Sequence, residues 1–250
     1  MSTDQATVQP SPQRSEALRQ FCQQLGLNMA TCPDVSRTLA LVNEALTHTS
    51  AGLQVNHERL EFLGDAVLRL AASEYIEQHH GQLPVGDRSA LRAQLVSDRW
   101  LAALGAEINL EAVQQIGAKA KGDAAGRATL QAEATEALIG AIYQGWGSLE
   151  PVHHWLTPHW QRTSAAVLAD PHKGNAKSAL QEWSQARKLG LPSYRSAEIS
   201  QNHGDPRRFH CQVELQGRSL AEGWGSSRRE AEQKAAQAAL QHLEGDGSQT

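Results

Sequence analysis

Asn56 to Ala72 read NHERLEFLGDAVLRLAA, and their spacing predicts one amphipathic helix. Each residue of a helix turns by about 100°, so with Glu58 at zero, Glu61 lies at roughly 300° and Asp65 at roughly 340°. The opposite face is expected to enter a core through its apolar side chains, Leu60, Leu63, Val67 and Leu70. Acids stacked on one stripe repel one another. The simplest cation that could offset this repulsion is a divalent metal with oxygen ligands.

A second acidic helix is predicted from about Ala128 to Trp146, where TLQAEATEALIGAIY places Glu133 and Glu136 on one face. Small residues beside them are expected to leave room for ions or a substrate backbone, and larger apolar residues to face a core. The small residues are Ala137 and Gly140, and the apolar ones are Leu138, Ile139 and Ile142. If the two helices pack side by side, four carboxylates converge. Such a set suits two Mg²⁺ ions about 4 Å apart, the arrangement used in phosphodiester hydrolysis.

Three other interpretations of these acids were weighed. A solvated charged face explains either acidic pair alone and stays open until the two helices are placed together. A di-iron carboxylate bundle needs Glu-x-x-His twice, and the sequence offers it once, from Glu77 to His80. A zinc-protease helix needs a second His four residues after the first. The residue four places after His57 is Glu61, which excludes that interpretation.

Size and composition favour one or two mostly helical domains. The chain has 250 residues, of which 40% are hydrophobic, 20% charged and only 5% aromatic, which argues against a β-sandwich. The net charge of −4 gives no whole-chain signal for nucleic acid. It hides an asymmetry, because residues 1–173 carry 13 basic and 18 acidic side chains, whereas residues 174–244 carry 10 and 8. The C-terminal part is therefore mildly basic.

Nothing in the sequence predicts export or a membrane. The first residues lack the apolar segment of a secretory signal, and no apolar run approaches the ~20 residues that span a bilayer. Cys22, Cys32 and Cys211 show no paired spacing and are interpreted as inert thiols in a reducing compartment. We therefore expect a soluble, cytoplasmic protein with no membrane partner.

The hydrophobic period changes along the chain and predicts two domains, an all-α one followed by an α+β one. The expected parts are a disordered segment (1–13), the helical domain (14–168), a linker (169–174), the α+β domain (175–245) and a tail (246–250). The α+β domain reads α-β-β-β-α. Its expected elements are Ala176–Leu189, Tyr194–Ser200, Phe209–Leu215, Arg218–Gly223 and Arg228–Leu243, with a tight turn at Gln216-Gly217.

Capping residues predict where helices of the first domain begin. The first helix is expected from Ser15, and Ser36 is expected to cap the second. Asp87 or Ser89 is expected to cap a single helix that carries the apolar stripe from Leu91 onward to residue 104.

The α+β domain carries a candidate phosphate-binding helix start. SSRREAEQKAA places Ser226 and Ser227 as candidate caps and Arg228 and Arg229 in the first turn, where amide groups and the helix dipole favour an anion. Two arginines at that point indicate a phosphate backbone. Gln181 and Gln185 stand four residues apart on the earlier helix, where amides could reach groove edges or 2′-hydroxyl groups. An ordinary charged first turn and plain surface glutamines are the alternatives.

These motifs resemble those of a known family, ribonuclease III. ERLEFLGDAVL looks like its signature, ATEALIGAIY like its second acidic motif, and ALQEW followed by GSSRREAEQKAA like its double-stranded-RNA-binding domain. The resemblance covers about residues 14–244. It implies a homodimer with an all-helical endonuclease domain that cleaves both strands of duplex RNA with Mg²⁺, for which Mn²⁺ can substitute. The products would have 5′-phosphate and 3′-hydroxyl ends with two-nucleotide 3′ overhangs. The substrates would be rRNA precursors and some structured mRNA and tRNA.

The resemblance also assigns roles by position. Four acids match the metal ligands, and the second of each pair matches a catalytic residue: Glu61, Asp65, Glu133 and Glu136, with Asp65 and Glu136 catalytic. Six residues match RNA contacts: Gln181, Gln185, Ser227, Arg228, Arg229 and Lys234. Phe62 lies at roughly 40°, beside the acid stripe, and matches a residue that inserts into the partner subunit. A contact within the chain is the alternative for this side chain.

Three departures from the family pattern are visible. Glu133 stands where most members have Asp, and Val85 stands where most have an acid. The loop NHGDPRRF lacks the family's Gly-Pro-x-His pattern, for which His203, Arg207 and Arg208 could substitute. The rival interpretation is a catalytically inactive duplex-RNA-binding or ribosome-assembly protein with the same fold. Retention of all four acids argues against it, because packed like charges without a metal only destabilise a fold.

Overall fold

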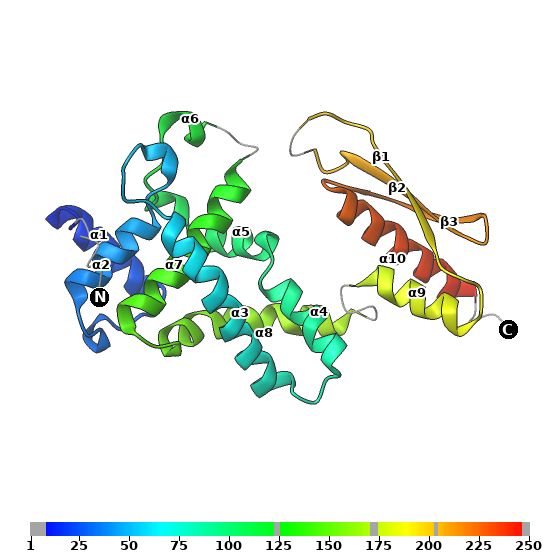
Figure 1. The fold of residues 1–250 in the computed structure, drawn as a ribbon, viewed down its shortest axis with the longest axis horizontal. Helices are drawn as coiled ribbons and strands as arrows, with labels where there is room; N and C mark the ends of the chain where they lie inside the picture. Colours follow the sequence, from blue (N-terminus) through cyan, green and yellow to red (C-terminus); the bar gives the residue numbers. More distant parts are fainter. Residues whose placement is uncertain (1–8, 123–125, 171–174, 203–204, 247–250) are drawn as a thin grey trace, which may run out of the picture. The chain divides into compact units, whose positions relative to one another are not determined.

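The structure, a computed structural model, describes residues 9–122, 126–170, 175–202 and 205–246 (Figure 1). The chain divides into two compact units, residues 1–166 and 167–250, and each is described by itself. Most of the predicted linker, most of the predicted disordered segment and His203 lie outside the described residues.

Every helix or strand assigned in the described residues of the first unit is a helix, which confirms the predicted fold class. Its long helices bury one apolar face each, and the core is rich in leucine and alanine. The α-helices are α1 (Pro12–Gln24), α2 (Val35–Ala45), α3 (Glu58–His80), α4 (Val85–Leu95), α5 (Asp98–Glu107), α6 (Ala118–Lys121), α7 (Arg127–Trp146) and α8 (Glu150–Ala169). Short 3₁₀ turns lie at Met29–Thr31, Thr49–Ala51 and Leu110–Ala112.

Helices α3 and α7, cyan and green in Figure 1, cross at the centre of this unit with their main chains in contact. A methyl group on Gly64 of α3 would overlap the carbonyl oxygen of Glu136, and one on Gly140 of α7 would overlap that of Leu60. The prediction that Gly140 leaves room for ions or a substrate is therefore wrong. The room at Gly140 is taken by the backbone of the neighbouring helix.

The buried face of α3 is rotated from the predicted one. Leu60 and Val67 are buried as expected, but Leu70 is 53% exposed and Leu68 is fully buried instead. Gly64 explains the rotation, because the close approach at this residue turns its side of α3 toward α7. The acidic stripe consequently borders the packed face rather than opposing it.

Several helix starts differ from their predicted positions. Ser11 caps α1 by accepting a hydrogen bond from the backbone of Arg14, so the predicted disorder of residues 12 and 13 is wrong. Asp34, not Ser36, caps α2. Pro84, whose ring fixes φ, precedes the first turn of α4, so that Asp87 and Ser89 lie inside the helix.

The single helix predicted to follow Asp87 is two helices. The chain leaves α4 after Leu95, and the side chain of Ser97 accepts a hydrogen bond from the backbone of Trp100 to begin α5. Because a serine cap competes with helix continuation, the apolar stripe alone could not reveal this break.

The second unit packs two helices on one three-stranded antiparallel sheet of order β1-β2-β3. Its elements are α9 (Ala176–Ala186), β1 (Ser193–Glu198), β2 (Phe209–Leu215), β3 (Arg218–Gly225) and α10 (Arg228–Asp246). This order confirms the predicted α-β-β-β-α fold. The tight turn falls at Gln216-Gly217 as predicted, with φ of 50° and 76°. Helix α9 ends earlier than predicted, because Lys188 adopts a φ of 58°.

Two further observations concern the cysteines and the helices. Cys22, Cys32 and Cys211 are all unpaired, and Cys22 and Cys211 are buried. In the described ranges, each helix is too short or too polar to cross a bilayer.

Candidate active site and nucleic-acid interface

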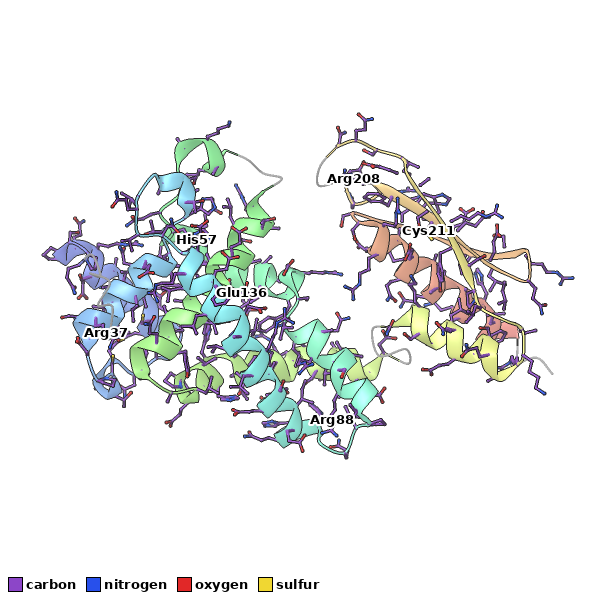
Figure 2. The ribbon with its side chains drawn as sticks, viewed as in Figure 1. Arg37, His57, Arg88, Glu136, Arg208 and Cys211 are labelled. Carbon is purple, nitrogen blue, oxygen red and sulfur yellow. The ribbon has the colours of Figure 1, made fainter. Side chains whose placement is uncertain are left out.

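The crossing of α3 and α7 positions the four predicted metal ligands. Glu61 and Asp65 follow the buried face of α3, and Glu133 and Glu136 occupy the adjoining face of α7 (Figure 2 labels Glu136). Gly64 sets the spacing, because it brings the main chain of α3 against Glu136 itself. The side chains of Glu61 and Glu133 are 33% and 32% exposed, and that of Asp65 is 47% exposed. The acids are therefore open to solvent yet partly desolvated.

The acids interact electrostatically across the crossing. Burial raises the pKa of Glu136 to about 7, and the negative charges of Asp65, Glu61 and Asp98 add to this effect. Burial also raises the pKa of Glu61, with the charge of Glu133 as the next cause. Each helix therefore disfavours ionisation of acids on the other. A cation between the helices would remove this penalty.

The four carboxylates do not form one compact ligand shell. Asp65 forms an ion pair with Arg69, one turn further along α3, in which the Nε atom of Arg69 lies 2.7 Å from the carboxylate oxygen. In the part of the chain that the structure describes, a single group of three or more potential ligand atoms lies within 4.8 Å, and it combines Glu133 with His48 and His57. The structure therefore brings Glu133 close to two histidines as well as to the acids of α3.

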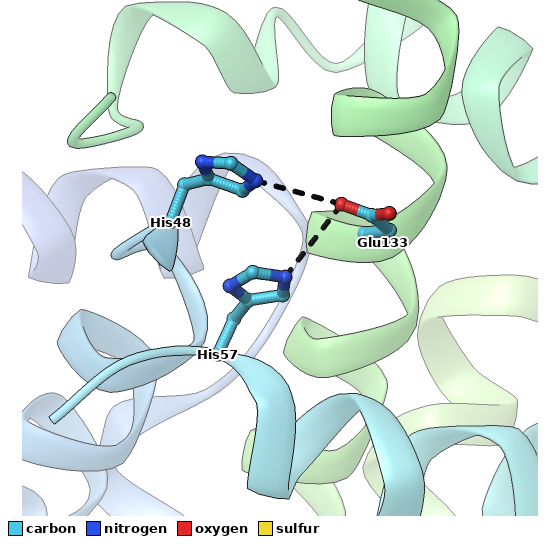
Figure 3. Close-up of side chains that lie close together, drawn as sticks. All are labelled: His48, His57 and Glu133. Atoms are coloured by element: carbon cyan, nitrogen blue, oxygen red, sulfur yellow. Dashed lines mark ion pairs between the residues drawn. The ribbon is translucent and has the colours of Figure 1, made fainter. Parts of the chain in front are cut away.

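From the sequence, His57 was considered only in a zinc-protease helix, which was excluded, and His48 was not considered. The Nε2 atom of His57 lies 3.3 Å from a Glu61 oxygen. It also lies 3.6 Å from a Glu133 oxygen, and the Nε2 atom of His48 lies 3.7 Å from the same Glu133 oxygen (Figure 3). His57 had a usable signal, because it precedes Glu61 by four residues on the same helical face. His48 precedes a 3₁₀ turn, where no helical period could place it.

At the start of α10, the predicted phosphate-binding residues are exposed. The Ser227 hydroxyl accepts a hydrogen bond from the backbone of Glu230 at 3.2 Å, which confirms the predicted cap. Arg228 and Arg229 are exposed, and neither pairs with an acid among the described residues. Lys234 differs, because its ammonium group forms a 2.9 Å ion pair with Glu230.

Comparison with known proteins gives matches for both units of the chain. A family model described as ribonuclease-III-like matches residues 39–152, and one for the double-stranded RNA binding motif matches residues 176–243. "Ribonuclease 3" of Prochlorococcus marinus is 57% identical over 205 residues, which are 82% of each chain. This chain belongs to the ribonuclease III family. It is an endoribonuclease specific for double-stranded RNA, of a family whose nucleases need a divalent metal.

Two further similarities accompany this ribonuclease III assignment. "Ribonuclease 3 2" of Nostoc sp. is 41% identical over 229 residues, which cover 92% of this chain and 93% of that one. The solved nuclease domain of ribonuclease III from Campylobacter jejuni is 29% identical with a TM-score of 0.46, and the match covers 62% of this chain and 96% of that domain.

An apolar stripe on the ribonuclease III unit is open to solvent. Phe62 is 85% exposed and Leu70 is 53% exposed, and exposed Ala66 lies between them on α3. The alternative of a contact within the chain does not hold for the Phe62 ring in the described part of this unit. Large exposed apolar side chains in one stripe indicate an interaction surface.

The remaining predicted contacts lie on the RNA-binding unit. Gln181 and Gln185 are exposed on α9, and Gln181 and Arg229 line the same hollow of about 460 Å³. The loop arginines are engaged within the unit. The Arg207 guanidinium lies 4.8 Å from the centre of the Trp224 ring, and Arg208 pairs with Glu198 at 2.8 Å.

Proposed function

We propose that this ribonuclease III uses Mg²⁺ to cleave both strands of duplex RNA. The products have 5′-phosphate and 3′-hydroxyl ends with two-nucleotide 3′ overhangs. We further propose rRNA precursors and some structured mRNA and tRNA as substrates, and the cytoplasm as the compartment. The observation that carries the proposal is the Glu136 carboxyl, whose pKa is raised to about 7 at the helix crossing. Acids held together at this cost are expected where a cation completes the site.

The donor set fits Mg²⁺. Glu61, Asp65, Glu133 and Glu136 offer carboxylate oxygens, the ligands that Mg²⁺ prefers, and their partial exposure leaves space for the water molecules that it retains. Mn²⁺ accepts the same oxygen ligands and can substitute. Bound metal would lower the pKa of an attacking water and offset charge on the phosphate.

The four acids and Arg69 have separate proposed roles. Asp65 and Glu136 are the proposed catalytic acids, and Arg69 neutralises Asp65 at 2.7 Å. Because its pKa is about 7, the Glu136 carboxyl holds a proton for part of the time near neutral pH until a cation arrives. Glu61 and Glu133 hold and orient the cation from opposite helices.

RNA binding is proposed to occur on the face shared by α9 and the start of α10. Arg228 and Arg229, unpaired among the described residues, are placed for phosphate oxygens beside the free amides of the first helical turn. Gln181 and Gln185 are exposed for minor-groove edges and 2′-hydroxyl groups. Recognition by such contacts depends on A-form shape more than on sequence. Lys234 contributes only if RNA phosphate replaces Glu230 as its partner.

A homodimer through α3 is proposed from the exposed stripe of Phe62, Ala66 and Leu70. Burying a Phe side chain stabilises an assembly by about 1.5–3 kcal/mol. The stripe adjoins the acids on the same helix, so a two-fold pairing would place two acid clusters near one interface. Two such clusters are what cleavage of both strands requires.

The decisive experiment is a cleavage assay on duplex and single-stranded RNA of the same sequence. The expected result is cutting of duplex alone with Mg²⁺ and none with EDTA. Ca²⁺, which tolerates looser geometry, is expected to support binding without cutting. Duplex binding without cleavage under all metals would establish the rival, a non-catalytic RNA-binding protein.

A further inference from the structure

Two histidines and one glutamate form a compact group beside the four acids (Figure 3). The rings of His48 and His57 are stacked, with centroids 5.0 Å apart and planes 22° from parallel. Because of this stacking, both Nε2 atoms face one oxygen of Glu133, at 3.7 and 3.6 Å. We propose that His48, His57 and Glu133 form a second metal site, for a transition-metal dication of the Zn²⁺ class.

The spacing of the donor atoms fits such an ion. Nitrogen and oxygen ligands lie about 2.0–2.2 Å from Zn²⁺ in a tetrahedral site, which places neighbouring ligand atoms roughly 3.3–3.6 Å apart. The two nitrogen–oxygen distances to Glu133 are within a few tenths of an ångström of this range. Glu61, whose oxygen lies 3.3 Å from the Nε2 atom of His57, is available as a fourth ligand. Ligation therefore needs only small changes in these three nitrogen–oxygen distances.

The outer nitrogens of both rings are already oriented. The Nδ1 atom of His57 lies 3.3 Å from the carbonyl oxygen of Thr47, which can only accept, so Nδ1 is the donor in this contact and Nε2 is the ring atom that a metal would bind. The Nδ1 atom of His48 accepts a hydrogen bond from the backbone N–H of Ser50 at 3.0 Å and lies 2.7 Å from the Ser50 hydroxyl. Metal binding through the Nε2 atom of His48 therefore requires its proton to move to Nδ1, where the Ser50 hydroxyl can accept the hydrogen bond in place of the backbone contact. Outer hydrogen bonds of this kind fix the tautomer and orientation of metal-binding histidines.

Burial makes the group costly without a cation. His57 is 4% exposed, yet its Nε2 atom points at carboxylates of two helices. In a neutral imidazole, an Nε2 lone pair that faces carboxylate oxygens is repelled by them, and a cation bound between them would remove this repulsion. Imidazole ligands suit Zn²⁺ and Co²⁺, whereas Mg²⁺ prefers oxygen. The two sites therefore select different metals while sharing Glu133.

Sharing Glu133 has a functional consequence that rests on the proposed function. A Zn²⁺ ion on the histidines takes a carboxylate from the Mg²⁺ site, so low concentrations of Zn²⁺ should slow cleavage that is saturated with Mg²⁺. Replacing His57 by Asn should remove this inhibition. Unchanged inhibition in His57→Asn would show that Zn²⁺ acts elsewhere.

The binding test uses the full, tag-free chain, freed of metal and then titrated with ZnCl₂ in excess Mg²⁺ by calorimetry. Mg²⁺ occupies oxygen-only sites, so the remaining heat reports the histidine group. One Zn²⁺ per chain is expected, and His57→Asn and His48→Asn should each weaken binding by more than about 10-fold, the least that loss of an outer-shell group causes. Visible absorption of Co²⁺ should report a four-coordinate ion in the parent and lose intensity in both variants.

His153→Asn is the matched control. His153 pairs with Glu74 at 2.8 Å in a histidine–carboxylate contact that belongs to no group of three donors among the described residues. This variant should bind Zn²⁺ as the parent does. Circular dichroism without metal checks the fold, and the half-buried His48 provides a second variant if loss of the buried His57 side chain disturbs folding.

Two results would overturn the site: no Zn²⁺ binding by the parent in Mg²⁺, or equal affinity in both histidine variants. In either case the histidines are only ion-pair partners of Glu61 and Glu133. Failure of the proposed function is separable, because Mg²⁺-dependent cleavage is measured without Zn²⁺. If the chain binds Zn²⁺ through the histidines but never cuts duplex RNA, the zinc site stands and the proposed Mg²⁺-dependent cleavage is wrong.

Discussion

The two functional surfaces of this ribonuclease III have opposite electrostatics. At the crossing of α3 and α7, burial and neighbouring acids raise the pKa of Glu136 to about 7. At the start of α10, partial burial raises the pKa of Glu230, but hydrogen bonds from Lys234 and Ser226 outweigh it and lower the pKa to about 2. The first surface has unbalanced acids, and the second has a satisfied acid beside free arginines. Each surface therefore lacks the charge that its ligand brings.

The largest expected effect comes from removing one acid at the crossing. Glu136→Gln should reduce duplex cleavage at least 100-fold, since even outer-shell partners of a metal contribute about 10–100-fold. Duplex binding should stay nearly unchanged, because the proposed RNA contacts lie on the other unit. Single-turnover cleavage and filter binding on the same RNA measure both. Cleavage at the parent rate would show that Glu136 is not in the metal site.

The apolar stripe on α3 belongs to neither charged surface. Phe62→Glu should weaken self-association by at least about 100-fold, because two Phe rings lose their burial, each worth about 1.5–3 kcal/mol. Sedimentation velocity over a range of concentrations measures the change. Ile199→Glu is the control, since Ile199 is 56% exposed on the other unit. Identical profiles for Phe62→Glu and the parent would remove α3 from the interface.

The crossing can also be broken without touching a charge. Gly140→Ala should destabilise the first unit by about 1–3 kcal/mol, as overpacking does, because the new methyl group would overlap the carbonyl oxygen of Leu60. Gly86→Ala is the matched control, since its methyl group would meet open space on α4 and should be neutral or stabilising. Urea unfolding measures both. Equal stability of the two variants would contradict the main-chain contact.

Removing positive charge at the start of α10 should affect the binding of duplex RNA. The double change Arg228→Ala and Arg229→Ala should weaken duplex binding about tenfold and reduce the slope of log affinity against log salt by about one to two. Arg218→Ala, an exposed arginine on β3, is the control. Titrations at several salt concentrations measure the slope. An unchanged slope would exclude the start of α10 from the phosphate contact.

The smallest expected effect is a pH dependence of stability without metal. An acid whose pKa is raised from 4.5 to about 7 in the folded protein binds more protons folded than unfolded between these values, so stability falls as pH rises through that window. Glu136→Gln should therefore exceed the parent in thermal stability by an amount that grows from pH 5 to about pH 7. Scanning calorimetry in EDTA measures this, with the exposed Glu150→Gln as control. A difference that stays constant with pH would contradict the raised pKa.

The sequence predicted the features that follow from a periodic pattern of side chains, and it missed those that depend on a single contact. The helical period placed Glu61, Asp65, Glu133 and Glu136 on facing stripes, and the three strands of the second unit emerged from alternation. The rotated core face of α3 could not be predicted, because it depends on the main-chain contact at Gly64 rather than on hydrophobicity.

The break between α4 and α5 and the position of His48 were missed for a related reason. The break depends on one capping hydroxyl, that of Ser97, within an unbroken apolar stripe. His48 is brought beside Glu133 by a 3₁₀ turn, which leaves no period in the sequence. Single contacts of this kind are decided by tertiary structure.

The contact between the main chains of α3 and α7 makes this chain suitable as a substrate trap. Because backbone atoms at Gly64 and Gly140 set the helix spacing, an acid can be exchanged for its amide without moving the scaffold around it. A variant such as Asp65→Asn should then hold duplex RNA in an uncut complex. Cross-linking that complex in living cells and sequencing the captured RNA would identify the transcripts that the enzyme processes.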